Sequence, residues 1–89
     1  GVRVRSAIPQ MTSKEKKEFE GIDQRLEEIG EELKQIDEEI AEHANDFAML
    51  QTLSQKRDSV EALQAETEER WLYLNDLYQK IQDFKQGKF

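Results

Sequence analysis

Apolar side chains recur at steps of three and four residues along the first half of the chain, at Phe19, Ile22, Leu26, Ile29, Leu33, Ile36 and Ile40. A stripe with this period is too narrow for a globular core and suits the seam of a coiled coil. The pattern stops at residues 43–46 and resumes from Leu50 to Phe84. Two helices joined by a turn of a few residues lie antiparallel, so the first stripe can pack against the second in the same chain. We therefore predict an all-α fold, a monomeric two-helix antiparallel coiled-coil hairpin.

Composition agrees with this fold class. The chain has 89 residues, enough for one small domain, and 37% of them are charged, with one Pro and four Gly. These proportions are typical of long helices and not of β or α/β domains. The absence of cysteine agrees with a reducing compartment, and we expect a cytoplasmic location. No apolar run approaches the roughly 20 residues that span a bilayer, so we expect no membrane contact.

Capping signals predict where the hairpin begins. Residues 1–11 contain Pro9 and have no helical period, so we predict an N-terminal linker or tail, followed by a hairpin over residues 12–86. Thr12 and Glu15 have the spacing of a capping box, in which each side chain accepts a hydrogen bond from the backbone N–H of the other. Such a cap is typically worth ~1 kcal/mol.

The interruption in the apolar pattern predicts the turn. We expect the first helix over about 13–43, the turn over about 44–46 and the second helix over about 47–85. Asn45 tolerates a left-handed conformation and suits the position just past a helix end. Asp46 is a good N-cap for the second helix. The chemistry of the turn therefore supports the break that the missing apolar residues indicate.

Reflection of the sequence about the turn predicts which seam residues face each other. The predicted pairs are Ile40 with Leu50, Ile36 with Leu53, Ile29 with Val60, Leu26 with Leu63, and Ile22 with Thr67. At the open end, Phe19 falls opposite Arg70 or Trp71. We predict that Trp71 packs against Phe19 and that Tyr73 is exposed, where it could stack on a base.

Charge is distributed unevenly along the chain, whose net charge is -7. Residues 1–18 carry +3, residues 19–46 carry -9 and the remaining residues carry -1. The acidic residues form the solvated outer face of the first helix, here called the acidic shaft. Folding at the turn gathers basic residues at the opposite end of the rod, here called the basic end: Arg3, Arg5, Lys14, Lys16, Lys17, Lys80, Lys85 and Lys88. This end attracts polyanions while the shaft repels them.

The sequence offers little for catalysis or cofactor binding. His43 is the single histidine and there is no cysteine, so we predict no metal site. Carboxylates on an exposed helix lack the burial that would tune them as acid or base, so we predict no catalytic residue and no enzyme activity. The chain contains neither a GxxxxGK[ST] nor a GxGxxG phosphate-binding motif, so we expect no nucleotide cofactor here. These exclusions favour an interaction module.

Three short motifs follow one another along the chain. They are Met-Thr-Ser-Lys-Glu at 11–15 with Glu-Phe-Glu at 18–20, Asp-Phe at 46–47, and Glu-Arg-Trp at 69–71 with Leu74 three residues later. In order and spacing they resemble the C-terminal coiled-coil domain of the ABC-F ATPases, in its Uup-like branch. That domain usually opens with Leu-Ser-Tyr-Lys-Glu, so Ser13 stands here in place of an aromatic residue. The resemblance runs from Met11 to about Tyr78.

The resemblance implies a larger protein and a class of partner. Members of this family look like soluble tandem ATPases that act at the ribosome during translation, and the C-terminal domain of this branch is associated with nucleic-acid binding. The parent protein would then hold ATP and Mg²⁺ in an N-terminal part, and the start at Gly1 instead of Met is what we expect of a segment of a longer protein. By the same resemblance this domain would be non-catalytic and would contact ribosomal RNA or DNA through the residues of the basic end.

A structural coiled coil for self-association or protein docking is the alternative function. Two hairpins could pair through residual apolar surface, or the chain could straighten across residue 45 into a long parallel dimer. The basic end distinguishes nucleic-acid binding from a structural role, because a cluster of positive charge is of little use to a scaffold. A protein that binds polyanions through such an end shows an affinity that falls steeply with salt.

Overall fold

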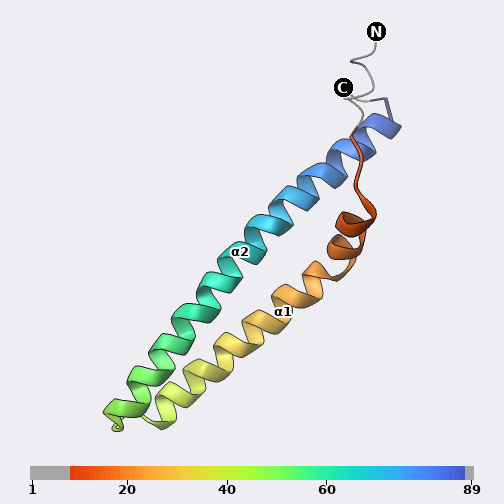
Figure 1. Cartoon of the computed structure of the whole chain (residues 1–89). Helices are drawn as coiled ribbons and strands as arrows, with labels where there is room; N and C mark the ends of the chain where they lie inside the picture. The colour runs from red at the N-terminus through yellow and green to blue at the C-terminus, as the bar shows by residue number, and fades with distance from the viewer. Residues whose placement is uncertain (1–8, 88–89) are drawn as a thin grey trace.

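The protein forms a rod of two antiparallel helices that lie side by side (Figure 1). A computed structural model describes residues 9–87, in which helix α1 spans Ser13–Glu42 and helix α2 spans Phe47–Lys85. The rod measures 68 × 21 × 20 Å. The described residues contain no strand, and α1 and α2 pack on each other. The predicted fold class, an all-α helical hairpin, is therefore confirmed.

Side-chain caps satisfy the first backbone N–H groups of both helices. The Thr12 N–H donates to Glu15 Oε1 at 2.9 Å, and the Glu15 N–H donates to Thr12 Oγ1 at 3.1 Å. Both halves of the predicted capping box are thus present at the start of α1. At the start of α2, Asp46 Oδ1 accepts from the Met49 N–H at 3.1 Å, which confirms Asp46 as the N-cap.

The turn closes without a left-handed residue. Among the described residues only Gly87 has a positive φ, so Asn45 does not adopt the left-handed conformation that its position suggested. Instead, α1 ends at Glu42 and the Asp46 N–H donates to the His43 carbonyl oxygen at 2.9 Å. This hydrogen bond closes a tight turn in which no side chain needs a positive φ. The reversal therefore begins at His43, one residue earlier than expected.

The buried core repeats every seven residues on each helix. The buried residues in the described part are Ile22, Ile29 and Ile36 on α1 and Leu53, Val60, Thr67 and Leu74 on α2. All seven occupy the d positions of a coiled-coil heptad. Ile29 and Val60, which the seam reflection paired, pack in one cluster with Ile36. The polar member, Thr67, donates from its hydroxyl to the Leu63 carbonyl oxygen at 2.7 Å, which satisfies a group that would be costly to bury alone.

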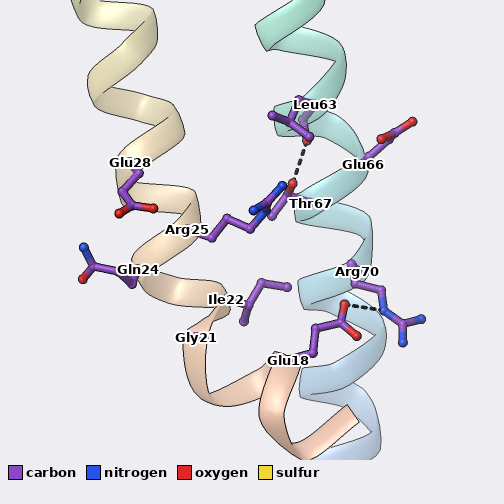
Figure 2. A pocket seen from close by; sticks show the side chains of 10 residues that line it. All are labelled: Glu18, Gly21, Ile22, Gln24, Arg25, Glu28, Leu63, Glu66, Thr67 and Arg70. Carbon is purple, nitrogen blue, oxygen red and sulfur yellow. Dashed lines mark hydrogen bonds and ion pairs between the residues drawn. The ribbon is translucent and has the colours of Figure 1, made fainter. Parts of the chain in front are cut away.

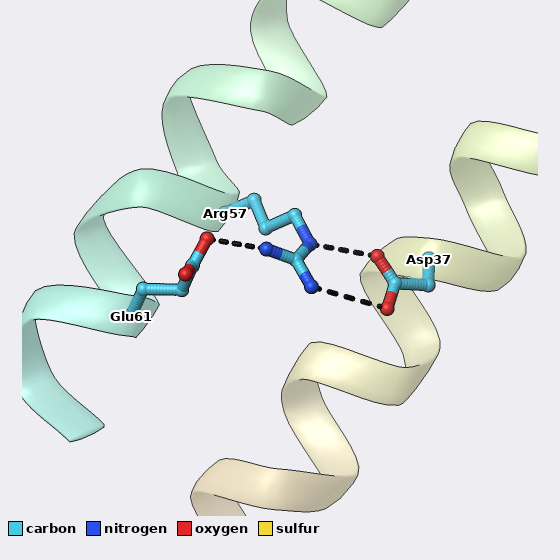
Figure 3. A network of polar contacts seen from close by, with 3 residues as sticks. All are labelled: Asp37, Arg57 and Glu61. Atoms are coloured by element: carbon cyan, nitrogen blue, oxygen red, sulfur yellow. Dashed lines mark hydrogen bonds and ion pairs between the residues drawn. The ribbon is translucent and has the colours of Figure 1, made fainter. Parts of the chain in front are cut away.

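Polar side chains cross the seam beside this core. Arg57 donates from Nε to Asp37 Oδ1 at 2.7 Å and from Nη2 to Asp37 Oδ2 at 3.4 Å, and its Nη1 contacts Glu61 on the same helix (Figure 3). This contact lowers the pKa of Asp37 and raises the pKa of Arg57. Two heptads away, the Trp71 indole N–H donates to Asp23 Oδ1 at 3.0 Å. Both contacts join an acid on α1 to a donor at an a position of α2.

Phe19 stacks on a different ring from the one that the seam reflection suggested. Its centroid lies 5.2 Å from that of Tyr78, with the ring planes 27° apart, whereas the half-buried Trp71 hydrogen-bonds to Asp23. The shift follows from side-chain direction, because side chains on a helix lean toward its N-terminus. That direction is toward the open end for α1 and toward the turn for α2. Phe19 and Tyr78 therefore lean toward each other although their backbone positions are not level.

Halfway between the contacts of Asp23 and Asp37, one heptad position in the described residues has no equivalent hydrogen bond between the helices. Gly30 lies one heptad from each of these acids, and Gln64 lies one heptad from both Trp71 and Arg57. A Cβ atom on Gly30 would meet no other atom within 4 Å, so a side chain has room there. A carboxylate at position 30 would thus repeat the geometry of its two neighbours, with the Gln64 amide as donor.

Gly30→Asp should therefore couple energetically to Gln64. In a double-mutant cycle with Gln64→Ala, we expect a coupling of about 1 kcal/mol, the usual net value of one hydrogen bond. Gly30→Ala should gain about 1 kcal/mol from helix propensity alone and should not depend on Gln64. Urea unfolding of the single and double variants measures both quantities. A coupling of zero for Gly30→Asp would show that the two side chains do not meet.

Candidate nucleic-acid interface

Five of the eight residues assigned to the basic end lie in the described part of the chain. They are Lys14, Lys16 and Lys17 in the first two turns of α1, and Lys80 and Lys85 in the last two turns of α2, and all five are exposed. Figure 1 places these two helix ends at the same end of the rod. Arg3, Arg5 and Lys88 lie outside the described residues.

The two groups of lysines are offset along the rod axis. α2 continues past the level at which α1 begins (Figure 1). Lys85 therefore projects beyond Lys14, and Lys80 lies between these levels. The five lysines therefore lie at several levels along this end of the rod.

Acidic side chains lie among these lysines. Lys80 Nζ pairs with Asp76 Oδ2 at 3.0 Å, one helical turn away. Arg70 Nε donates to Glu18 Oε2 at 2.6 Å between the two helices, and this hydrogen bond raises the pKa of Arg70. The Lys80 side chain is 66% exposed, so its ion pair contributes little to stability and can be exchanged for a phosphate contact.

Tyr73, the candidate for base stacking, is engaged with its neighbours. It is 49% exposed, in agreement with the prediction, but the Arg70 guanidinium carbon lies 4.9 Å from the centroid of its ring. Its hydroxyl donates to Glu15 Oε2 at 2.9 Å, and this hydrogen bond raises the pKa of Tyr73. Arg70 therefore covers one face of the ring, and a base would have to use the other face or displace Arg70.

Glu15 links the cap of α1 to the contact with α2. Its Oε1 accepts from the Thr12 N–H while its Oε2 accepts from the Tyr73 hydroxyl. The bond from the Thr12 N–H, and after it the bond from Tyr73, lowers the pKa of Glu15 because both stabilise the carboxylate. One side chain thus holds the first turn of α1 in place against the opposite helix.

An open groove with a volume of about 670 Å³ lies between the helices next to these contacts (Figure 2). Arg25 extends across it from α1 toward Thr67 on α2 (Figure 2). The charged lining consists of Glu18, Glu28, Glu66, Arg25 and Arg70. Because acids outnumber arginines in this lining, the groove is a poor site for a phosphate group. The exposed lysines of the basic end are the better surface for a polyanion.

The described residues do not fit the ATP and Mg²⁺ that the resemblance implies for the parent protein. Within residues 9–87, no three His, Asp or Glu side chains are grouped so as to hold a metal ion. The sequence also lacks a phosphate-binding loop. In the same part of the chain, neither α1 nor α2 combines the length and apolar character of a membrane-spanning helix.

The fold and its surface define a class of protein, a coiled-coil hairpin domain with charged ends. Residues 10–76 match the family described as the ABC transporter C-terminal domain, and the chain belongs to this family. It is therefore a C-terminal domain of an ABC protein and not itself catalytic. A comparison with curated proteins found no match, and a comparison with solved structures found none.

The sequence indicated Glu15 as a cap and Tyr73 as exposed, but the polar contacts that join the two helices at the open end were not predicted. Reflection about the turn, extended from apolar to polar residues, places Glu18 level with Arg70 and Glu15 level with Tyr73. The structure joins both pairs by hydrogen bonds. Reflection of the sequence about the turn, which predicted the seam pairs, could therefore also have predicted these two contacts.

We expect Glu15→Gln to lower the Tm near neutral pH, and the difference from the unchanged protein to shrink on acidification. The pKa of Glu15 in the folded state lies below its ordinary value of 4.5. Its contribution to stability is therefore present above that ordinary value and is lost as the pH falls through the folded-state pKa. Thermal unfolding followed by circular dichroism between about pH 7 and about pH 3 measures the difference.

Glu20→Gln is the matched control, since Glu20 is an exposed carboxylate of the same helix. It should change the Tm less than Glu15→Gln at neutral pH. A Tm difference for Glu15→Gln that stays constant over the whole pH range would contradict the role given to this carboxylate.

Proposed function

We propose that this hairpin is an interaction domain that contacts nucleic acid, either ribosomal RNA or DNA, through its basic end. We also propose that its parent is a cytoplasmic ATPase of the ABC-F family, Uup-like branch, that acts at the ribosome and holds ATP and Mg²⁺ outside this chain. Membership of the ABC transporter C-terminal domain family supports the place of the domain in an ABC protein. The motif resemblance supports the branch and the partner.

One observation carries the proposal for nucleic acid. Exposed lysines from both helices lie at the same end of a rod whose shaft is acidic. Contacts between lysines and phosphates supply most of the affinity of non-specific nucleic-acid binding. Exposed lysines at one end of the rod can contact a phosphodiester backbone, and repulsion by the shaft would confine the polyanion to the basic end.

Replacing Lys14, Lys16 and Lys17 by Glu should abolish the binding of a DNA or RNA oligonucleotide. We expect the unchanged domain to bind weakly, with a Kd of roughly 100 µM as is common for non-specific binders, and more weakly as salt rises from about 50 to about 200 mM. Glutamate near a helix N-terminus is favourable, so the triple variant should keep its helix content. Fluorescence anisotropy measures the affinity, and circular dichroism measures the helix content.

Lys34→Glu combined with Lys56→Glu is the control, because both lysines are exposed and lie on the rod away from the basic end. This double variant should weaken binding far less than the triple variant does. Binding that survives the triple change, or that is equal at low and high salt, would favour the alternative of a structural docking module.

We propose that the hairpin is a monomer, because its two apolar stripes bury each other and leave Ile36 and Leu74 almost fully inaccessible. Sedimentation equilibrium at micromolar concentration should give a mass of 10.5 kDa. The self-associating alternative would use apolar residues that remain on the surface, such as Leu72, which is 60% exposed. A mass twice that of the chain would support that alternative and count against the monomer.

A further inference from the structure

The turn end of the rod presents an aromatic side chain that the fold does not cover. Phe47 is 80% exposed, the highest value among the exposed large apolar residues of the described part. Other aromatic residues are engaged, since Phe19 stacks on Tyr78 and Trp71 hydrogen-bonds to Asp23. Phe47 therefore contributes little to packing within the hairpin.

Helix capping does not involve the Phe47 ring either. Phe47 is the first residue of α2 and directly follows the N-cap Asp46. A hydrophobic staple would join the residue before the cap, Asn45, to Leu50, and it would not include Phe47. Asp46 accepts its hydrogen bond from the Met49 N–H without help from the ring. The large exposed ring thus has no local structural role.

The surroundings of Phe47 are acidic. Residues 35–55 include five acids and no Lys or Arg. Asp37 is paired with Arg57, and the other four acids are exposed: Glu38, Glu39, Glu42 and Asp46. We call residues 38–49 the acidic tip. Its charge repels nucleic acid, so the polyanion proposed for the basic end does not fit here.

We propose that the acidic tip is a docking site for a protein, whose surface offers an apolar pocket ringed by Lys or Arg and receives Phe47. Protein interfaces depend on a few buried anchors, and an aromatic ring surrounded by polar side chains has this form. Complementary charge guides such a partner to the tip and excludes acidic ones.

This site is separate from the basic end. The 30 residues of α1 lie between the two ends, and at the rise of an α-helix they span about 45 Å. The hairpin therefore holds a nucleic acid and a basic protein surface apart at a fixed distance. The docking site does not require the nucleic-acid contact, so the two proposals can fail independently.

The test uses a synthetic amphipathic helical peptide as the probe, with leucines along one face and lysines on both flanks. The peptide is titrated into the isotope-labelled chain and followed by NMR. We expect the shifts of backbone amide signals to concentrate at residues 43–50. Phe47→Ala should raise the Kd roughly 30-fold, the change produced by removing an interface anchor. Because Phe47 is exposed, the Tm of this variant should be unchanged.

Leu72→Ala is the matched control, since Leu72 is another exposed apolar residue of α2 but lies far from the tip. It should leave the Kd unchanged, as should the triple replacement of Lys14, Lys16 and Lys17 by Glu. A peptide with Glu in place of its lysines should not bind.

Several results would overturn the proposal. One is equal affinity of Phe47→Ala and the unchanged chain for the lysine peptide. Another is a set of NMR shifts centred on residues 19–34 of α1. Movement of the tip signals by an oligonucleotide would assign the tip to nucleic acid. A dimer that Phe47→Ala dissociates would assign it to a second copy of the chain.

Discussion

One buried side chain per heptad on each helix holds the rod together. The buried positions follow each other at intervals of seven residues, from Ile22 to Ile36 on α1 and from Leu53 to Leu74 on α2. Only partly buried residues such as Leu33, Ile40 and Leu63 pack against this core, so little buried surface can compensate for a lost contact. Truncating one of its large members to Ala therefore belongs to the class of changes that cost about 2–5 kcal/mol. Every other feature of the hairpin depends on this seam staying closed.

The polar contacts beside the seam mainly fix the register of α1 against α2. Exposed ion pairs such as that of Arg57 with Asp37 contribute little stability one by one. A slip of one helix by a heptad would still match d positions, because these repeat every seven residues. It would separate Arg57 from Asp37 and Glu18 from Arg70, which face each other in one register only. These contacts and the short turn together specify a single alignment.

The closed seam also separates two ends of different chemistry. At the open end, exposed lysines from both helices lie around a framework in which Glu15 connects the cap of α1 to Tyr73. At the turn, the exposed ring of Phe47 lies in a segment that contains exposed acids and no Lys or Arg. In this C-terminal domain of an ABC protein, the exposed lysines lie at one end of the rod, and the acids and Phe47 lie at the other. The function that we propose for this domain is one of contact and position.

The sequence alone determined the two helices, their N-caps and the seam, because apolar spacing and capping residues act locally or with a simple period. It also located the exposed lysines of the described basic end, since charges outside the seam face water. Only the tertiary structure decided that Phe19 stacks on Tyr78 and that the Arg70 guanidinium lies over the Tyr73 ring. It also decided that Phe47 remains exposed. Periodicity specifies which face of a helix is buried. It does not specify how far side chains lean along the axis, and that lean decides which residues touch across two antiparallel helices.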